Sequence, residues 1–246
     1  EVEDQRNNAD ASFKTYNRSN MMPRPYVLRA GDVVRQRVEL VLETPRARAR
    51  AKRDSSITVR IGREARDLPS IGVEILPDDA AADTLAREAR RRALQALRPA
   101  HLHLAVDAGV TAVDWNGVAE LLQAAGAGLR LDVALGDAAQ VRPALVALCR
   151  DLRSARVTPD SIAVFPGSRR IVDVARRTFP DVRIGSGTPH FFVQLNRAER
   201  LGDVDFLTFT TSSIVHGTDD EAVMTSLSSL PSMIATLDAR YPGVPI

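Results

Sequence analysis

Short apolar runs alternate with segments of helical periodicity from about residue 70 to the end of the chain. Each apolar run has the length of a strand, and each amphipathic segment after it repeats its apolar positions about every 3.6 residues. We expect the strands at 71–76, 101–107, 129–135, 161–165, 182–185 and 204–209. We expect the helices at 83–97, 114–125, 140–154, 169–178, 191–199 and 221–240, with a seventh strand beginning near Val244. Asp114 is the expected N-cap of the second helix, and Gly126 and Gly128 are expected to end it.

Six strand–helix units of roughly thirty residues each predict an α/β fold with a parallel sheet. The interpretation that we favour is a (β/α)8 barrel of the TIM type that is incomplete, because only about six of its eight units are present. A doubly wound open sheet is the alternative. No Gly-x-Gly-x-x-Gly follows the first strand and no Walker-type loop occurs, which weakens a nucleotide-binding interpretation.

The part of the chain before residue 57 has a different character. Residues 21–42 show partial period-2 alternation around a turn at Gly31-Asp32, which indicates two strands of an antiparallel sheet. We therefore divide the chain into residues 1–43, the C-terminal part of an N-terminal β-sandwich domain, residues 44–56, a basic linker, and residues 57–246, the barrel. The chain begins at Glu1 without a methionine and stops where a strand would start, so we expect a fragment of a longer protein.

Composition narrows the classes of partner. Apolar residues make up 44% of the chain and charged residues 26%, and the net charge is +2, too small to indicate a polyanion as partner. The basic run at 46–53 carries no interleaved aromatic residues, so we predict no nucleic-acid binding. No apolar run is long enough to span a membrane, no signal peptide is visible, and the single cysteine, Cys149, lies in an apolar helical stripe. We expect a cytoplasmic protein in which Cys149 is a small buried residue.

The stretch from Asp203 to Asp220 provides the strongest candidates for chemistry. It begins as a buried strand and becomes polar at its carboxyl end, which is where parallel α/β proteins bind their ligands. His216 is the best candidate for a general base, because histidine titrates near neutral pH. Asp219 is the best candidate for its partner. The alternatives are a structural histidine and an aspartate that only caps the following helix.

Polar or glycine residues at the other strand ends are candidates for substrate binding. These are Glu74, Asp107, Gly187, His190 and Thr210, together with Asn196 in an early helical position. The run Gly185-Ser-Gly-Thr-Pro-His allows either a close backbone approach to a ligand or a tight strand-to-helix turn. His101 and His103 lie at the start of their strand, the end associated with stability, and we discount both.

Residues 1–20 are dense in hydrogen-bonding side chains. We interpret this segment either as solvated chain or as a wall that meets a polar ligand, with Glu3, Arg6, Asn7 and Lys14 as its candidate residues. The four histidines are scattered, so the sequence predicts no metal site, and it predicts no organic cofactor. No Gly-x-Ser-x-Gly elbow is present, which argues against an α/β-hydrolase esterase.

Three motifs resemble those of the bacterial D-apionate lactonases. Residues 1–16 (Glu-Val-Glu-Asp-Gln-Arg-Asn-Asn-Ala-Asp-Ala-Ser-Phe-Lys-Thr-Tyr) are similar to the segment between their sandwich and barrel. Ser213-Ile-Val-His-Gly-Thr-Asp-Asp resembles their sixth-strand region, and Phe191-Phe-Val-Gln-Leu-Asn-Arg the helix before it. The chain therefore resembles a TIM-barrel sugar lactonase.

The resemblance implies a hydrolase that opens a sugar-acid lactone, D-apionolactone to D-apionate, in carbohydrate catabolism. We expect His216 to activate water with Asp219 as its partner, and Lys14 or Arg6 to stabilise the oxyanion. Two alternatives stay open, a glycoside hydrolase-like barrel and a non-catalytic carbohydrate-binding barrel. The fourth strand ends Val-Phe-Pro-Gly-Ser, without the Asn-Glu pair of the commonest barrel glycosidases, which counts against glycoside hydrolysis.

Overall fold

The structure is a computed structural model, and it describes residues 25–35, 37, 39, 68–79, 84–214 and 218–246. The chain divides into two compact units. The unit that contains Ser70–Ile246 holds all the helices and strands described below. The predicted domain boundaries near residues 43 and 57 lie outside the described residues.

Six strands form one parallel sheet in the order β1-β2-β3-β4-β5-β6. They are β1 (Gly72–Ile75), β2 (His101–Asp107), β3 (Gly128–Ala134), β4 (Ser161–Phe165), β5 (Arg183–Phe191) and β6 (Leu207–Thr210). Neighbours in sequence are thus neighbours in the sheet. A doubly wound sheet reverses its strand order at a switch point, whereas a barrel adds each new strand at the same edge. The predicted barrel-type α/β fold is therefore confirmed, and the open-sheet alternative is wrong.

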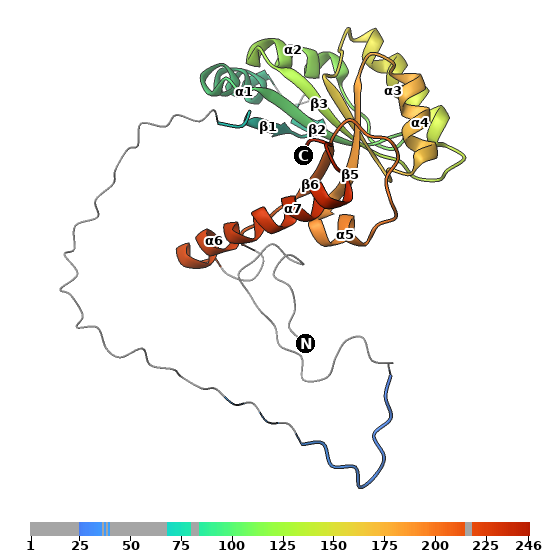
Figure 1. The fold of residues 1–246 in the computed structure, drawn as a ribbon. Helices are drawn as coiled ribbons and strands as arrows, with labels where there is room; N and C mark the ends of the chain where they lie inside the picture. Colours follow the sequence, from blue (N-terminus) through green and yellow to red (C-terminus); the bar gives the residue numbers. More distant parts are fainter. Residues whose placement is uncertain (1–24, 36, 38, 40–67, 80–83, 215–217) are drawn as a thin grey trace, which may run out of the picture. The chain divides into compact units, whose positions relative to one another are not determined.

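Helices connect the strands. The α-helices are α1 (Thr84–Leu97), α2 (Trp115–Ala125), α3 (Val141–Ser154), α4 (Arg169–Thr178), α5 (Phe192–Arg197), α6 (Asp220–Ser226) and α7 (Leu230–Arg240). The short 3₁₀ helices are η2 (Pro77–Asp79) and η3 (Leu227–Ser229). Helices α1 to α4 lie along one side of the strands (Figure 1). Because each crossover from one parallel strand to the next has the same hand, successive helices cover the same face.

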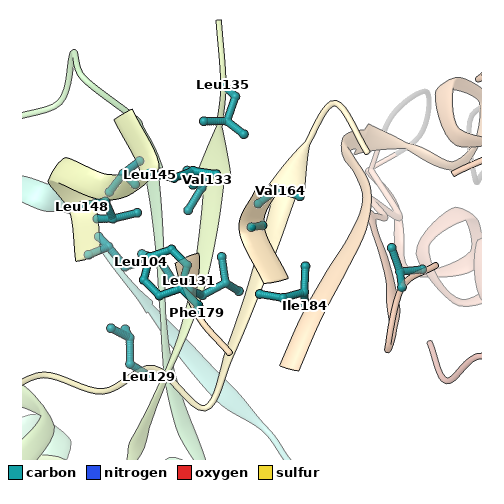
Figure 2. Close-up of a cluster of buried hydrophobic side chains, with 14 of the residues drawn as sticks. Leu104, Leu129, Leu131, Val133, Leu135, Leu145, Leu148, Val164, Phe179 and Ile184 are labelled. Carbon is teal, nitrogen blue, oxygen red and sulfur yellow. The ribbon is translucent and has the colours of Figure 1, made fainter. Parts of the chain in front are cut away.

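Alternating apolar residues attach that face of the sheet to the helices. In β2 the buried residues are Leu102, Leu104 and Val106, and in β3 they are Leu129, Leu131 and Val133. Figure 2 shows this layer, in which Leu145 and Leu148 of α3 lie beside the β3 side chains. Each such side chain contributes about 1.5–3 kcal/mol when it leaves water completely. The period-2 pattern of the sequence thus selects which face of each strand receives the helices.

The ends of α2 match the caps that its sequence predicts. Asp114 precedes the helix, and its Oδ1 accepts a hydrogen bond from the N–H of Gly117 at 3.1 Å. Gly126 ends the helix in the left-handed conformation, at φ 62°, which is strained for a residue with a Cβ atom.

Strand β5 is longer than predicted. The run from Gly185 to His190, expected as a turn or a ligand loop, continues the strand to Phe191, with an irregular register between Gly187 and Phe191. Pairing with β6 explains the extension, because Ser186 and Gly187 lie opposite Leu207 and Thr208. The hydroxyl of Ser186 donates to the Val164 carbonyl at 2.6 Å, so this buried polar side chain is satisfied.

The end of the chain also differs from the prediction. The single helix expected at 221–240 is divided into α6 and α7 by η3. Pro231 at the start of α7 has no N–H to donate to the preceding turn, which accounts for the break. No strand is assigned at Val244 among the described residues, but the N–H of Leu207 donates to the Pro245 carbonyl at 2.7 Å.

Residues 25–35 of the other unit contain the predicted turn but no strand. The N–H of Asp32 donates to the Arg29 carbonyl at 3.0 Å, and the Arg29 N–H donates to Asp32 Oδ2 at 2.7 Å. The expected flanking strands are absent from the described part of this region, where no second segment supplies a hydrogen-bonded ladder. Among the described helices, none has the length and apolar character needed to cross a membrane.

An ion pair connects α4 to the segment before β6. Arg176 Nη2 lies 2.8 Å from Asp205 Oδ1, and Asp205 Oδ2 accepts the N–H of Ile184 at 2.7 Å. Burial raises the pKa of Asp205, but the hydrogen bonds from Arg176 and Ile184 outweigh it, so the pKa lies below its usual value. Asp205 thus joins the segment before β6 to β5 through Ile184 and to α4 through Arg176.

Leu145→Ala should lower the free energy of unfolding by about 2–5 kcal/mol, because Leu145 is completely buried between α3 and the sheet. The matched control is Val146→Ala, one residue further along the same helix, where the side chain is 51% exposed and we expect a change within about 0.5 kcal/mol. Urea unfolding of the full-length variants measures both. Equal losses in the two variants would contradict the packing described here.

Asp205→Asn should lower stability by about 1–2 kcal/mol at pH 7, because it removes the charge that Arg176 contacts. The folded-state pKa of Asp205 is lowered, so its contribution is present above the unfolded value near 3.8 and is lost as the pH falls through the folded value. Melting temperatures of the parent and the variant should therefore converge as the pH is lowered through that range. A constant difference down to the acid limit would show that the charge of Asp205 contributes nothing.

Candidate functional site at the carboxyl ends of the strands

The face of the sheet opposite the helices carries polar side chains. In β2 this face presents His101, His103, Ala105 and Asp107, because these positions alternate with the buried leucines and valine. Asp107 is the last residue of its strand, so it lies at the carboxyl edge of the sheet, where ligands bind in this class of fold. The predicted position of Asp107 at a strand end is thus confirmed.

Small residues leave room on this face. Strand register aligns Ala105, Asp132, Ala163 and Gly185 in one row across β2 to β5. Bulky branched side chains normally fill the interior of such a barrel. Ala105 and Ala163 have only a methyl group on either side of the Asp132 carboxylate, whereas the Phe206 ring fills the place beside Gly185, where a Cβ atom would meet it at 2.3 Å.

A hollow of about 250 Å³ lies beside Ala105 and Asp132 of this row. It is lined by Ala105, Val106, Asp107, Thr111, Asp132, Ala134, Phe165 and Pro189. Asp107 and Asp132 provide its charge, Thr111 a hydroxyl, and Phe165 an apolar wall. Such a lining suits a small molecule that has hydroxyl groups on an apolar frame.

The connection after β2 positions Asp107 at the rim. The N–H of Asp107 donates to Thr111 Oγ1 at 3.0 Å, and the Asp107 carbonyl accepts from the N–H groups of Val110 and Thr111. Asp107 also lines a second hollow of about 630 Å³, with Gly136, Asp137 and Gln140 on its far side. The aspartate therefore separates the inner hollow from an outer groove beside α3.

Asp132 also lines a third hollow, of about 400 Å³, together with His103 and Ala163. His103 Nε2 is 3.2 Å from Asp132 Oδ2, and His103 Nδ1 is 4.0 Å from Glu74 Oε1. Hydrogen bonding to Asp132 raises the pKa of His103 more than burial lowers it, and the charges of Asp132 and Glu74 raise it further, against Arg130. The predicted residue Glu74 thus contacts a histidine that the sequence interpretation set aside.

Neither His103 nor Asp132 was selected from the sequence, although a signal for both exists. His101-Leu-His-Leu-Ala-Val-Asp and Leu129-Arg-Leu-Asp-Val-Ala each alternate buried and inward positions, which assigns His103 and Asp132 to the same face. The neighbouring His101 behaves differently, because burial, followed by the charges of Arg130 and His103, lowers its pKa. Its Nδ1 is buried and has no hydrogen-bond partner among the described residues.

Two predicted residues lie where β5 meets β6. The hydroxyl of Thr210 donates to the Pro189 carbonyl at 3.1 Å, which connects the end of β6 to the lining of the hollow. A Cβ atom at Gly187 would lie 1.8 Å from the Thr208 carbonyl oxygen. Close strand pairing therefore accounts for this glycine without a ligand.

The remaining described candidates lie outside the lining of the inner hollow. Asp219 is the N-cap of α6, since its Oδ1 accepts the N–H of Ala222 at 2.9 Å. Asn196 is exposed in α5 and its backbone carbonyl accepts a hydrogen bond from Arg240, while His190 is exposed near the end of β5. The predictions for Glu3, Arg6, Asn7, Lys14 and His216 fall outside the described residues.

Away from the strand ends, the described part of the chain holds a groove around its cysteine but no metal site. No group of three or more His, Cys, Asp or Glu side chains there is arranged to hold a metal ion. Cys149 is half-buried, not buried as predicted, because it lies in a groove between α3 and α4. Its Sγ donates a hydrogen bond to the Thr178 carbonyl at 3.7 Å. That groove, about 690 Å³, is lined by helix residues and not by strand ends.

Comparison with known proteins gives a consistent result. Residues 71–246 match the family model described as the D-apionate lactonase TIM barrel domain, and residues 1–45 match the D-apionate lactonase N-terminal domain. A curated D-apionate lactonase of Brucella anthropi is 32% identical over the whole of this chain, which spans 43% of that relative's length. The chain thus belongs to the D-apionate lactonase family, and its parallel sheet and hollow lie within the TIM barrel domain of that family.

Proposed function

We propose that this protein hydrolyses a sugar-acid lactone and that its substrate is D-apionolactone, which opens to D-apionate. The observation that carries the proposal is the family match over residues 71–246, the same residues that build the hollow. The D-apionate lactonase of Brucella anthropi is 32% identical to this chain over the aligned region, which is 43% of that relative's length. Membership of the family supports this reaction, and the carboxylates of the hollow suit a substrate with hydroxyl groups.

The hollow favours a single sugar ring. Its volume of about 250 Å³ lies below the about 300–1,000 Å³ of sites for drug-sized ligands. The commonest barrel glycosidases also place an Asn-Glu pair at the end of their fourth strand. At the end of β4, Phe165 lines the hollow instead of a carboxylate. These features support a lactone over a glycoside.

Lactone opening needs an activated water, a donor for the developing oxyanion and groups that hold the ring hydroxyls. His216, six residues after β6, is our candidate for the base, and Asp219 for its partner. A carboxylate has two oxygens, so Asp219 can cap α6 through Oδ1 and accept a second hydrogen bond through Oδ2. Lys14 or Arg6 is proposed as the oxyanion donor, and Asp107 and Thr210 as groups that bind hydroxyls.

The full-length protein should release one proton for each lactone opened, which a pH-indicator assay on a panel of sugar-acid lactones would follow. We expect the fastest reaction with D-apionolactone and no release of dye from aryl glycosides. If every lactone stays closed while D-apionate raises the melting temperature, the protein is a non-catalytic binder. Dye release with closed lactones would identify a glycosidase.

His216→Ala should lower kcat for lactone opening by about 10²-fold or more, because general base catalysis contributes about 10²–10⁴-fold. The control is Asp238→Asn, an exposed substitution in α7, for which we expect the parent rate. Steady-state kinetics with matched melting temperatures separate a catalytic loss from unfolding. Activity of His216→Ala within a fewfold of the parent would exclude His216 as the base.

A further inference from the structure

The His103–Asp132 pair is built across two strands and belongs to neither the helix-packing face nor the exposed rim. His103 is the third residue of β2, and Asp132 lies one inward position nearer the carboxyl edge, since its register partner is Ala105. Their side chains are 32% and 21% exposed, so both are partly withdrawn from water. Ion pairs of this kind add little to stability unless their remaining polar atoms are also satisfied.

One carboxylate oxygen of Asp132 is available to a ligand. Its Oδ2 lies beside His103 Nε2, whereas Oδ1 has no hydrogen-bond partner among the described residues. The residue lines the inner hollow together with Asp107 above it, and the neighbouring positions in its row are Ala105 and Ala163. A half-buried carboxylate oxygen that faces a cavity with small walls is placed to accept a hydrogen bond from a ligand.

The surroundings of this carboxylate favour the protonated form of His103. The charged and titratable groups that face His103 are Glu74 from β1, His101 from its own strand, and Arg130 and Asp132 from β3. Two of these are carboxylates, and the raised pKa of His103 shows that they dominate over the cations. An imidazolium has only donors, so its Nε2–H faces Asp132 in one fixed direction.

We propose that Asp132 forms the floor of the ligand site and accepts a hydrogen bond from a hydroxyl group of a small polyhydroxylated ligand. His103 is the positioning residue that holds the carboxylate toward the hollow. This proposal rests on the proposed function, because it assigns the lactone's hydroxyls to the floor and leaves its carbonyl at the rim. A carboxylate used in this way discriminates between ligands, because a ligand that lacks the hydroxyl would leave one partly buried carboxylate oxygen without a hydrogen-bond partner.

Asp132→Asn and His103→Gln in the full-length protein test the assignment with D-apionolactone as the substrate. We expect KM to rise tenfold or more in Asp132→Asn, while kcat stays within about threefold, because the hydroxyl contact is made equally in the ground state and the transition state. The control is Asp160→Asn, the same chemical change at an exposed position before the amino end of β4, where we expect an unchanged KM.

The pH dependence separates positioning from general structural support. His103 has a raised pKa, so its charge is complete below the ordinary value near 6.5 and is lost as the pH rises through the raised value. KM of the parent should therefore increase as the pH rises from 6 through the raised pKa of His103, measured against a blank for spontaneous lactone opening. In His103→Gln, KM should be raised already at pH 6 and should stay level across that range.

Two outcomes distinguish this inference from the proposed function. If the parent opens the lactone but Asp132→Asn keeps the parental KM, or if the pH dependence survives in His103→Gln, the floor assignment is wrong and the lactonase proposal stands. If the parent opens no lactone but D-apionate raises its melting temperature and not that of Asp132→Asn, the floor assignment stands and the lactonase proposal fails.

Discussion

Burial of one face of the parallel sheet against the helices is the constraint on which the rest of the structure depends. Leucine and valine at alternate positions of β2 and β3 are nearly or completely buried, and their partners on α3 are equally so. Since every crossover has the same hand, the helices collect on that face, and the opposite face is left for side chains that do not pack against them. The hollow and its charged floor follow from this separation of the two faces.

The carboxyl edge is held by hydrogen bonds that join neighbouring strands and loops. Thr111 holds the backbone of Asp107, Ser186 joins β5 to β4, and Thr210 joins β6 to Pro189. Glycine at position 187 lets β5 and β6 approach, because any Cβ atom there would meet the Thr208 carbonyl. A binding site needs such support, since its contacts depend on side chains that are held in place by their surroundings.

Sequence reasoning succeeded where the signal was local. The ranges of β2, β4 and α4 were predicted to the residue, and the capping roles of Asp114 and Gly126 are as expected. It failed for the extension of β5, because Ser186 and Gly187 become strand residues only through the pairing that β6 offers. Pattern alone could not distinguish a ligand loop from a paired strand in a run of small residues.

The sequence by itself determined the order of strands and helices, the inward or outward direction of each strand residue and, through its resemblance to a known family, the type of reaction to test. These properties follow from the spacing of apolar and polar residues along the chain, which is a local feature of the sequence. Only the tertiary structure decided that Asp132 lies beside His103 and below Asp107. The reason is that strand register and the sizes of residues on three different strands set that geometry together, and no single segment contains the information.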